Sequence, residues 1–226
     1  MRIPGSPVRR AGATLGLSAL GLSALVLFGA SLVLLGACGG GTGDSAKLGG
    51  VVRTPPLRVG TVALPDASAG GAPFTMRGPA NGLLLVYFGY TNCPDICPTT
   101  LADIGQAIRR LPAADRKRVD VAFVTVDPER DTGEVMTSFL DHFVQTGHAL
   151  RTDDRALQAS SESAFGVQAK KVVKDGEVSF DHTGFTYAVE DRGAVLVEWP
   201  FGLGADAMHK DLVTMLNRIR EQGEAT

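Results

Sequence analysis

Apolar runs along the chain alternate with polar segments, and the spacing inside each run predicts a type of secondary structure. Residues 83–89 (LLLVYFG) and 119–126 (VDVAFVTV) are short apolar runs bounded by turn residues, which is typical of strands covered on both faces. Residues 99–111 carry apolar side chains three and four positions apart, which predicts an amphipathic helix. The same reasoning predicts further helices over residues 132–146, 154–164 and 205–221, and strands over residues 167–173, 184–190 and 194–198.

The order of these elements indicates the fold class. Strand–helix–strand units come first, and a strand pair and a helix come last, so we expect an α/β domain with a central mixed sheet and helices on both faces. This order is that of the thioredoxin-like fold. The working site of such sheets lies beyond the carboxyl end of a central strand, where Cys93 stands. Asp131, with Glu134 three residues later, is predicted to cap the helix over residues 132–146.

The N-terminus has the layout of a secretory signal, with arginines followed by the uncharged, apolar residues 11–37. Residues 35–38 (LGAC) resemble the bacterial lipobox, which implies that residues 1–38 form a lipoprotein leader and that Cys38 is the lipid anchor. The alternative is an uncleaved transmembrane helix over residues 15–35, which is long enough to cross a bilayer. Both interpretations place the domain outside the cytoplasm, anchored to the outer face of the cell membrane.

Composition sets the limits of the folded domain and excludes one class of partner. Residues 39–56 are rich in Gly, Ser, Thr and Pro, which predicts a flexible linker, so the folded domain is expected over residues 57–222. Three of the 22 basic residues and none of the 24 acidic ones lie in residues 1–38, so the rest of the chain has a net charge of −5 with His neutral. A domain of this charge lacks the basic surface that nucleic-acid binding requires.

Two cysteines stand where the first long strand meets its helix, in the sequence Cys93-Pro-Asp-Ile-Cys97. Cys97 lies at the predicted helix start, where unpaired N–H groups and the helix dipole favour a thiolate, so we expect a lowered pKa for its thiol. Two Cα atoms four residues apart in a helical turn are roughly 6 Å apart, within disulfide reach. The pair can therefore close into a disulfide or bind a soft metal ion such as Cu(I), and an added imidazole suits Cu(II) as well.

A third metal ligand would have to come from a distant part of the chain, and a histidine is the expected type. The chain contains His142, His148, His182 and His209. His209 lies off the apolar stripe of the last helix, and His142 and His148 flank the end of an earlier helix. His182 precedes the last strand pair, where a thioredoxin-like chain turns back toward its cysteines, and Asp181 could orient its ring. Spacing alone does not distinguish His182 from a structural histidine.

Three sequence blocks are similar to the signature blocks of the Sco/SenC family of copper proteins. They are residues 88–98 (FGYTNCPDICP), 126–132 (VDPERDT) and 181–183 (DHT). The resemblance covers roughly residues 57–222 and implies that Cys93, Cys97 and His182 are the copper ligands. It also implies a role in delivering copper to, or reducing the cysteines of, the binuclear copper centre in subunit II of cytochrome c oxidase. Asp127 matches a motif position too, but strand termination explains it, so it is not a predicted ligand.

Three other functions of the cysteine pair remain open. A thiol-disulfide oxidoreductase or redox sensor would use the same pair, although thioredoxins have a Cys-x-x-Cys pair facing a cis-proline, whereas this chain has no proline between Pro128 and Pro200. A peroxidase-like enzyme would attack peroxide with a low-pKa cysteine. A purely structural disulfide would close a very small loop and so stabilise the domain little. A metallochaperone, rather than an enzyme, is therefore our main hypothesis.

Overall fold

The computed structural model describes residues 47–224 of the chain. The expected lipid anchor at Cys38 and the alternative membrane span over residues 15–35 lie outside the described residues. Within residues 47–224, no helix is long and apolar enough to span a membrane. The described residues belong to one compact unit, Asp44–Thr226.

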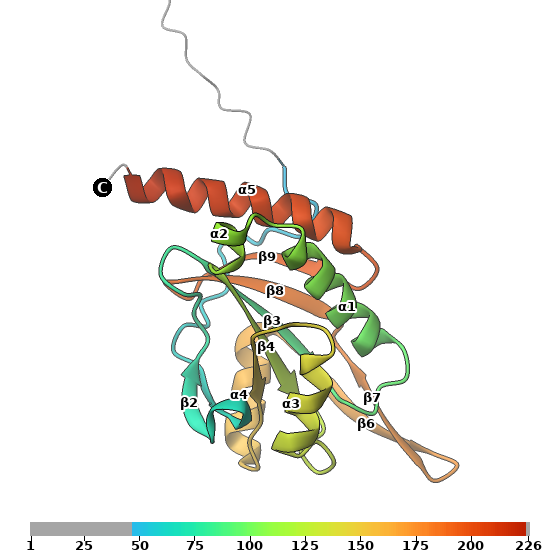
Figure 1. The fold of residues 1–226 in the computed structure, drawn as a ribbon. Coiled ribbons are helices and arrows are strands. Elements are labelled where there is room, and N and C mark those ends of the chain that lie inside the picture. The colour runs from blue at the N-terminus through green and yellow to red at the C-terminus, as the bar shows by residue number, and fades with distance from the viewer. Residues whose placement is uncertain (1–46, 225–226) are drawn as a thin grey trace, which may run out of the picture. The chain divides into compact units, whose positions relative to one another are not determined.

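This unit contains a seven-stranded sheet, a separate two-stranded hairpin and helices (Figure 1). The strands are β1 Ala63–Asp66, β2 Ala72–Thr75, β3 Leu83–Gly89, β4 Val119–Thr125, β5 Gly147–Leu150, β6 Ala169–Lys174, β7 Glu177–His182, β8 Phe185–Glu190 and β9 Val195–Pro200. The helices are α1 Ile96–Arg109, α2 Ala113–Arg116, α3 Gly133–Asp141, α4 Arg155–Phe165 and α5 Ala205–Glu224, with a short 3-10 helix at Ala67–Ala69.

The strand order of the large sheet is β2-β1-β5-β4-β3-β8-β9. Strand β4 pairs in parallel with both β3 and β5, because helices α1 and α3 form the crossovers between them. Strand β8 pairs antiparallel with β3 and with β9, as expected for a final hairpin. The sheet is therefore mixed, and the predicted α/β, thioredoxin-like fold is confirmed.

Aromatic contacts show which helices cover which face of the sheet. On one face, the rings of Tyr87 and Phe123 are 6.3 Å apart, and Phe123 in turn packs on Phe139 of α3. On the other face, Phe88 packs edge-on against Phe165 of α4 at 5.2 Å. Neighbouring strand residues point to opposite faces, so α3 and α4 lie on opposite sides of β3 and β4 (Figure 1).

Several short strands do not follow from the sequence pattern. Strands β1, β2 and β5 have four residues each, too few to show an alternating pattern. Strand β6 was expected near residues 167–173, but it pairs only with β7, in the separate hairpin. The cap of α3 also differs from the prediction, because Thr132, rather than Asp131, accepts a bond from the N–H of Val135.

The prediction of a flexible linker up to residue 56 is wrong for residues 49–53. The N–H groups of Gly49 and Gly50 donate to the carboxylate of Asp211 in α5, at 2.9 and 3.2 Å. Val51 pairs with Glu198 in β9 through two backbone hydrogen bonds. The reason is that the edge of β9 and the buried Asp211 both require hydrogen-bond partners. Composition alone does not reveal such long-range partners.

We expect Asp211→Ala to lower the free energy of unfolding by about 1–3 kcal/mol, because it leaves the buried indole N–H of Trp199 and the N–H groups of Gly49 and Gly50 without an acceptor. The side chain is buried and also accepts from the indole N–H of Trp199 at 2.8 Å. Chemical denaturation of a chain that starts at residue 44 measures this change. Asp206→Ala is the control, because that side chain is 83% exposed on the same helix and its surface ion pair with Arg110 should contribute less than about 1 kcal/mol. Equal losses in the two variants would contradict the assigned role of Asp211.

Candidate metal centre

The cysteine loop connects the end of β3 to the start of α1. Gly89 is the last residue of β3, and a Cβ atom added there would lie 2.9 Å from the sulfur of Cys97. Glycine therefore permits the strand to approach the thiol closely. Asp95, the N-cap residue of α1, makes no side-chain capping bond. Instead, the N–H of Cys97 donates to the sulfur of Cys93 at 3.4 Å.

His182 is the last residue of β7, and the structure places its ring against the second cysteine. Its Nε2 atom lies 3.8 Å from Cys97 Sγ, although 85 residues separate the two in the chain. Its Nδ1 atom is 3.1 Å from the carbonyl oxygen of Thr183. Because a carbonyl oxygen only accepts, Nδ1 carries the proton and Nε2 keeps its lone pair for the sulfur side. This carbonyl orients the ring, and not the Asp181 carboxylate that we expected.

The two cysteines are both free thiols, and they differ in exposure. Cys97 is buried, whereas Cys93 is partly exposed. Within residues 47–224, no three His, Cys, Asp or Glu side chains are grouped closely enough to hold a metal ion. The structure thus brings Cys97 and His182 together, and a three-ligand centre requires the sulfur of Cys93 to move closer to them.

Burial controls the protonation of the site. Loss of solvent raises the pKa of the Cys97 thiol to about 12, although a hydrogen bond from the Tyr87 hydroxyl, at 3.5 Å, acts in the opposite direction. The expected lowering of this pKa by the helix N-terminus is therefore wrong, because desolvation of the thiolate outweighs the dipole. Burial also lowers the pKa of His182, which keeps its imidazole neutral near pH 7.

The other three histidines have hydrogen-bond partners elsewhere in the fold. His148 contacts the carboxylate of Asp66 at 2.7 Å, which links β5 to β1. His142 and His209 each contact a backbone carbonyl oxygen, of Ser138 and Ala107 respectively. Of the four candidates in the sequence, His182 is the one found beside a cysteine.

Known proteins share this arrangement of elements. The family model described as SCO1/SenC matches residues 67–217, about two thirds of the chain. The chain belongs to the SCO1/SenC family. The SCO2-like protein of Rickettsia felis is 31% identical over 118 residues, which cover 50% of this chain and 56% of that relative. The chain thus matches little more than half the length of this curated relative.

Two solved structures of family members align over most of their length. The apo Sco1 protein of Thermus thermophilus has a TM-score of 0.63 and 30% identity, and the match covers 75% of this chain and 97% of that one. The copper-bound ScoI of Bradyrhizobium japonicum has a TM-score of 0.57 and 33% identity, covering 67% and 95%. Both comparisons support the fold described above.

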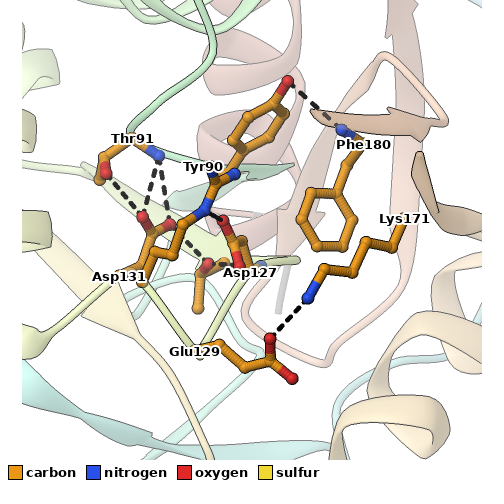
Figure 2. A network of polar contacts seen from close by, with 9 residues as sticks. Tyr90, Thr91, Asp127, Glu129, Asp131, Lys171 and Phe180 are labelled. Atoms are coloured by element: carbon orange, nitrogen blue, oxygen red, sulfur yellow. Dashed lines mark hydrogen bonds and ion pairs between the residues drawn. The ribbon is translucent and has the colours of Figure 1, made fainter. Parts of the chain in front are cut away.

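The second of the three sequence blocks, residues 126–132, forms a turn that holds the cysteine loop (Figure 2). The turn spans residues 127–131, and its Asp131 carboxylate is fully buried. It accepts bonds from the N–H and the hydroxyl of Thr91, at 3.1 and 2.6 Å, and from the hydroxyl of Thr125 at 2.6 Å. Thr91 stands two residues before Cys93, so the turn fixes the start of the cysteine loop.

The same turn also holds the hairpin that carries His182. Arg130 forms an ion pair with the buried Asp127, and its guanidinium lies 5.9 Å from the ring centre of Tyr90. The Tyr90 hydroxyl accepts the N–H of Phe180 in β7 at 3.4 Å (Figure 2). The rings of Tyr90 and His182 are also in edge contact, with centroids 6.1 Å apart.

A second tie between the turn and the hairpin is the ion pair of Glu129 with Lys171 of β6, at 2.6 Å (Figure 2). We define residues 127–131, together with Tyr90, as the clamp. Our sequence reasoning left Asp127 out of the site and missed Tyr90 and Arg130. The sequence did contain a sign of their importance, because all three residues lie in sequence blocks that resemble the family: Tyr90 in residues 88–98, and Asp127 and Arg130 in residues 126–132.

The alkylation rates of the two thiols should differ strongly. Iodoacetamide should modify the partly exposed Cys93 first, because Cys97 is buried and mostly protonated below its pKa of about 12. The rate at Cys97, measured in a Cys93→Ser variant by mass spectrometry, should rise about tenfold per pH unit between pH 7 and 10, since the thiolate fraction does so. Tyr87→Phe should slow it further, because the hydroxyl that stabilises the thiolate is lost. Comparable rates at both cysteines would be inconsistent with this assignment.

Tyr90→Phe should loosen the hairpin, because it removes the acceptor of the Phe180 N–H. We expect amide exchange at Phe180 to accelerate about tenfold, which corresponds to the loss of a hydrogen bond of about 1.4 kcal/mol. Hydrogen exchange followed by NMR measures this rate. The amide of Val189, which lies in the central sheet, is the internal control and should be unaffected. Unchanged exchange at Phe180 would show that the clamp does not hold the hairpin.

Proposed function

We propose that this chain is a membrane-anchored, extracytoplasmic copper chaperone that binds copper through Cys93, Cys97 and His182. Its acceptor is the binuclear copper centre of cytochrome c oxidase subunit II, which it loads or matures. The 3.8 Å contact between Cys97 Sγ and His182 Nε2 carries the proposal, because it joins a thiol and an imidazole from distant parts of the chain. Membership of the SCO1/SenC family and the copper bound to the Bradyrhizobium japonicum relative support it.

The donor set fits copper. Thiolate sulfur is a soft ligand that suits Cu(I), and imidazole nitrogen makes Cu(II) acceptable as well. Binding displaces the protons of both thiols, which includes the tightly held proton of Cys97. The neutral His182 offers a free Nε2 lone pair. When the sulfur of Cys93 moves closer to Cys97 and His182, it becomes the third ligand.

A site of three ligands, of which Cys97 is buried and Cys93 and His182 are partly exposed, suits delivery. The exposed fraction of Cys93 gives an acceptor thiol access to the metal, while Cys97 and His182 still hold it. Ligand exchange can then proceed one bond at a time, with no stage at which copper is free. The anchor that we infer at Cys38, or the alternative span over residues 15–35, would keep this exchange at the membrane surface, where subunit II is assembled.

The proposal predicts which variants lose copper. Cys93→Ser/Cys97→Ser should lower Cu(I) affinity by about 100-fold or more, because it removes both soft donors, and His182→Ala should lower it by about tenfold, because it removes one of three donors. Anaerobic competition with a Cu(I) chelator measures these affinities. His209→Ala is the matched control, because that ring contacts a backbone carbonyl outside the site, and its affinity should equal that of the wild type.

Delivery is tested by mixing the copper-loaded protein with the apo copper domain of subunit II under anaerobic conditions and following the metal. Copper should move to subunit II. Equal copper affinity in the wild type and the double cysteine variant would end the proposal, and retention of copper on the chaperone would end the delivery step.

A thiol-disulfide reductase that acts on the acceptor's cysteines is the second candidate. One contact favours it: the sulfur of Cys93 accepts the N–H of Cys97 at the start of α1, with both cysteines reduced. This contact holds a reduced, partly exposed sulfur at the helix start, where a disulfide substrate can reach it. Metal-free turnover against a disulfide substrate tests this function. Fast turnover without copper would favour the reductase over the chaperone.

A further inference from the structure

The candidate copper site borders a surface hollow with a volume of about 620 Å³. Cys93 and His182 both line it. Two large apolar side chains on its rim are exposed to solvent, Ile96 at 41% and Phe201 at 46%. Single exposed apolar residues are common on protein surfaces, but these two border the same hollow as the ligands. This position indicates a contact surface.

Backbone structure holds both side chains at the rim. Ile96 is the first residue of α1, one position before Cys97. Phe201 follows β9 directly, and its N–H donates to the carbonyl of Gly184 at 2.9 Å, two residues after His182. The apolar residues Pro94 and Phe180 also line the hollow. A partner would therefore meet fixed apolar anchors that need little ordering on binding.

Charge selects among the possible partners. The charged side chains that line the hollow beside the ligands are Asp95 and Asp181, and both are exposed. The nearest basic residue in the hairpin register is Lys170, opposite Asp181, which offsets part of its charge. The Asp95 carboxylate accepts a long hydrogen bond, of 3.5 Å, from the hydroxyl of Thr99. A second copy of this chain would place acid against acid here, and an anionic membrane surface would be repelled.

We propose that Ile96 and Phe201, with Asp95 and Asp181, form a docking face for a protein whose copper-receiving thiols are flanked by apolar and by Lys or Arg side chains. The inference rests on the proposed chaperone function and specifies the chemistry of its partner. Opposite charges across such a face accelerate encounter, and the small apolar contact allows rapid release. Both properties suit a transient delivery complex.

The transfer step conserves electrons and protons. Cu(I) keeps its oxidation state throughout. Each Cu–S bond to Cys93 or Cys97 that breaks is replaced by a Cu–S bond to a partner thiol. The Cu–N bond to His182 also breaks, and its electron pair returns to the neutral imidazole. The proton that the partner thiol loses passes to the departing cysteine sulfur, directly or through solvent. No oxidant or reductant is required.

Two synthetic acceptor peptides test the charge preference. Both contain the same Cys-x-x-x-Cys pair and one Phe, and they differ only in whether the flanking residues are Lys or Glu. The full chain, in detergent and loaded with Cu(I), should load the Lys peptide about tenfold faster at about 0.01 M salt, and the difference should vanish near 1 M salt. Asp95→Asn/Asp181→Asn should abolish the difference. Asp175→Asn, in the β6–β7 turn, is the matched control and should keep it.

The apolar anchors are tested by Ile96→Ser/Phe201→Ser, which should slow transfer to both peptides by about tenfold, the factor expected for one lost apolar contact. Val173→Ser is the control, because that side chain is 64% exposed but does not line the hollow, and its rates should be unchanged. Copper affinity is measured for every variant, so that a loss of docking can be distinguished from a loss of copper binding.

Equal rates for the two peptides in the wild type, or an undiminished preference in the variant without the two acids, would overturn the proposal. A copper-loaded dimer that dissociates in the Ile96→Ser/Phe201→Ser variant would assign the face to a second copy of the chain. Binding to anionic vesicles that this variant loses would assign it to the membrane. Either of these results would also overturn the proposal.

Discussion

The contact between Cys97 and His182 is the constraint on which the rest of the site depends. One residue lies at the start of the helix after the central strand β3, and the other ends the hairpin strand β7. Their 3.8 Å separation requires both elements to be held in place. The clamp does this from one turn, because Asp131 fixes the loop before Cys93, and Tyr90 fixes the hairpin before His182. The second family block thus fixes the first, and Tyr90 of the first block contacts the hairpin that carries the third.

Burial gives the three proposed ligands different tasks. Desolvation keeps Cys97 protonated and His182 neutral in the free protein, so the buried Cys97 thiol does not react readily with solvent species. Cys93 is the accessible thiol. A metal ion that replaces the thiol protons would be held at the buried Cys97 sulfur and exchanged at the partly exposed Cys93 sulfur. The apolar and acidic rim around Cys93 then decides which proteins come close enough for exchange.

Much of the fold follows from the sequence because its central elements have strong patterns. The apolar run at Leu83–Gly89 and the helical spacing after Cys97 are sufficient to predict that the cysteines lie at the carboxyl end of a central strand. The short strands β1, β2 and β5 are too brief for a pattern. Gly49 and Gly50 are held by Asp211 in the last helix, and Val51 is held by Glu198 in β9. The pKa of Cys97 was predicted in the wrong direction, because helix position is visible in a sequence and burial is not. His182 was singled out by family resemblance, whereas its contact with Cys97 depends on tertiary structure.

The most direct measurement of the central claim is X-ray absorption spectroscopy at the copper edge of the Cu(I)-loaded protein, in the wild type and in His182→Ala. The account predicts a first shell of two sulfur atoms and one imidazole nitrogen in the wild type, and loss of the imidazole signal with both sulfur atoms retained in the variant. A first shell without sulfur, or an imidazole signal that persists in His182→Ala, would contradict it.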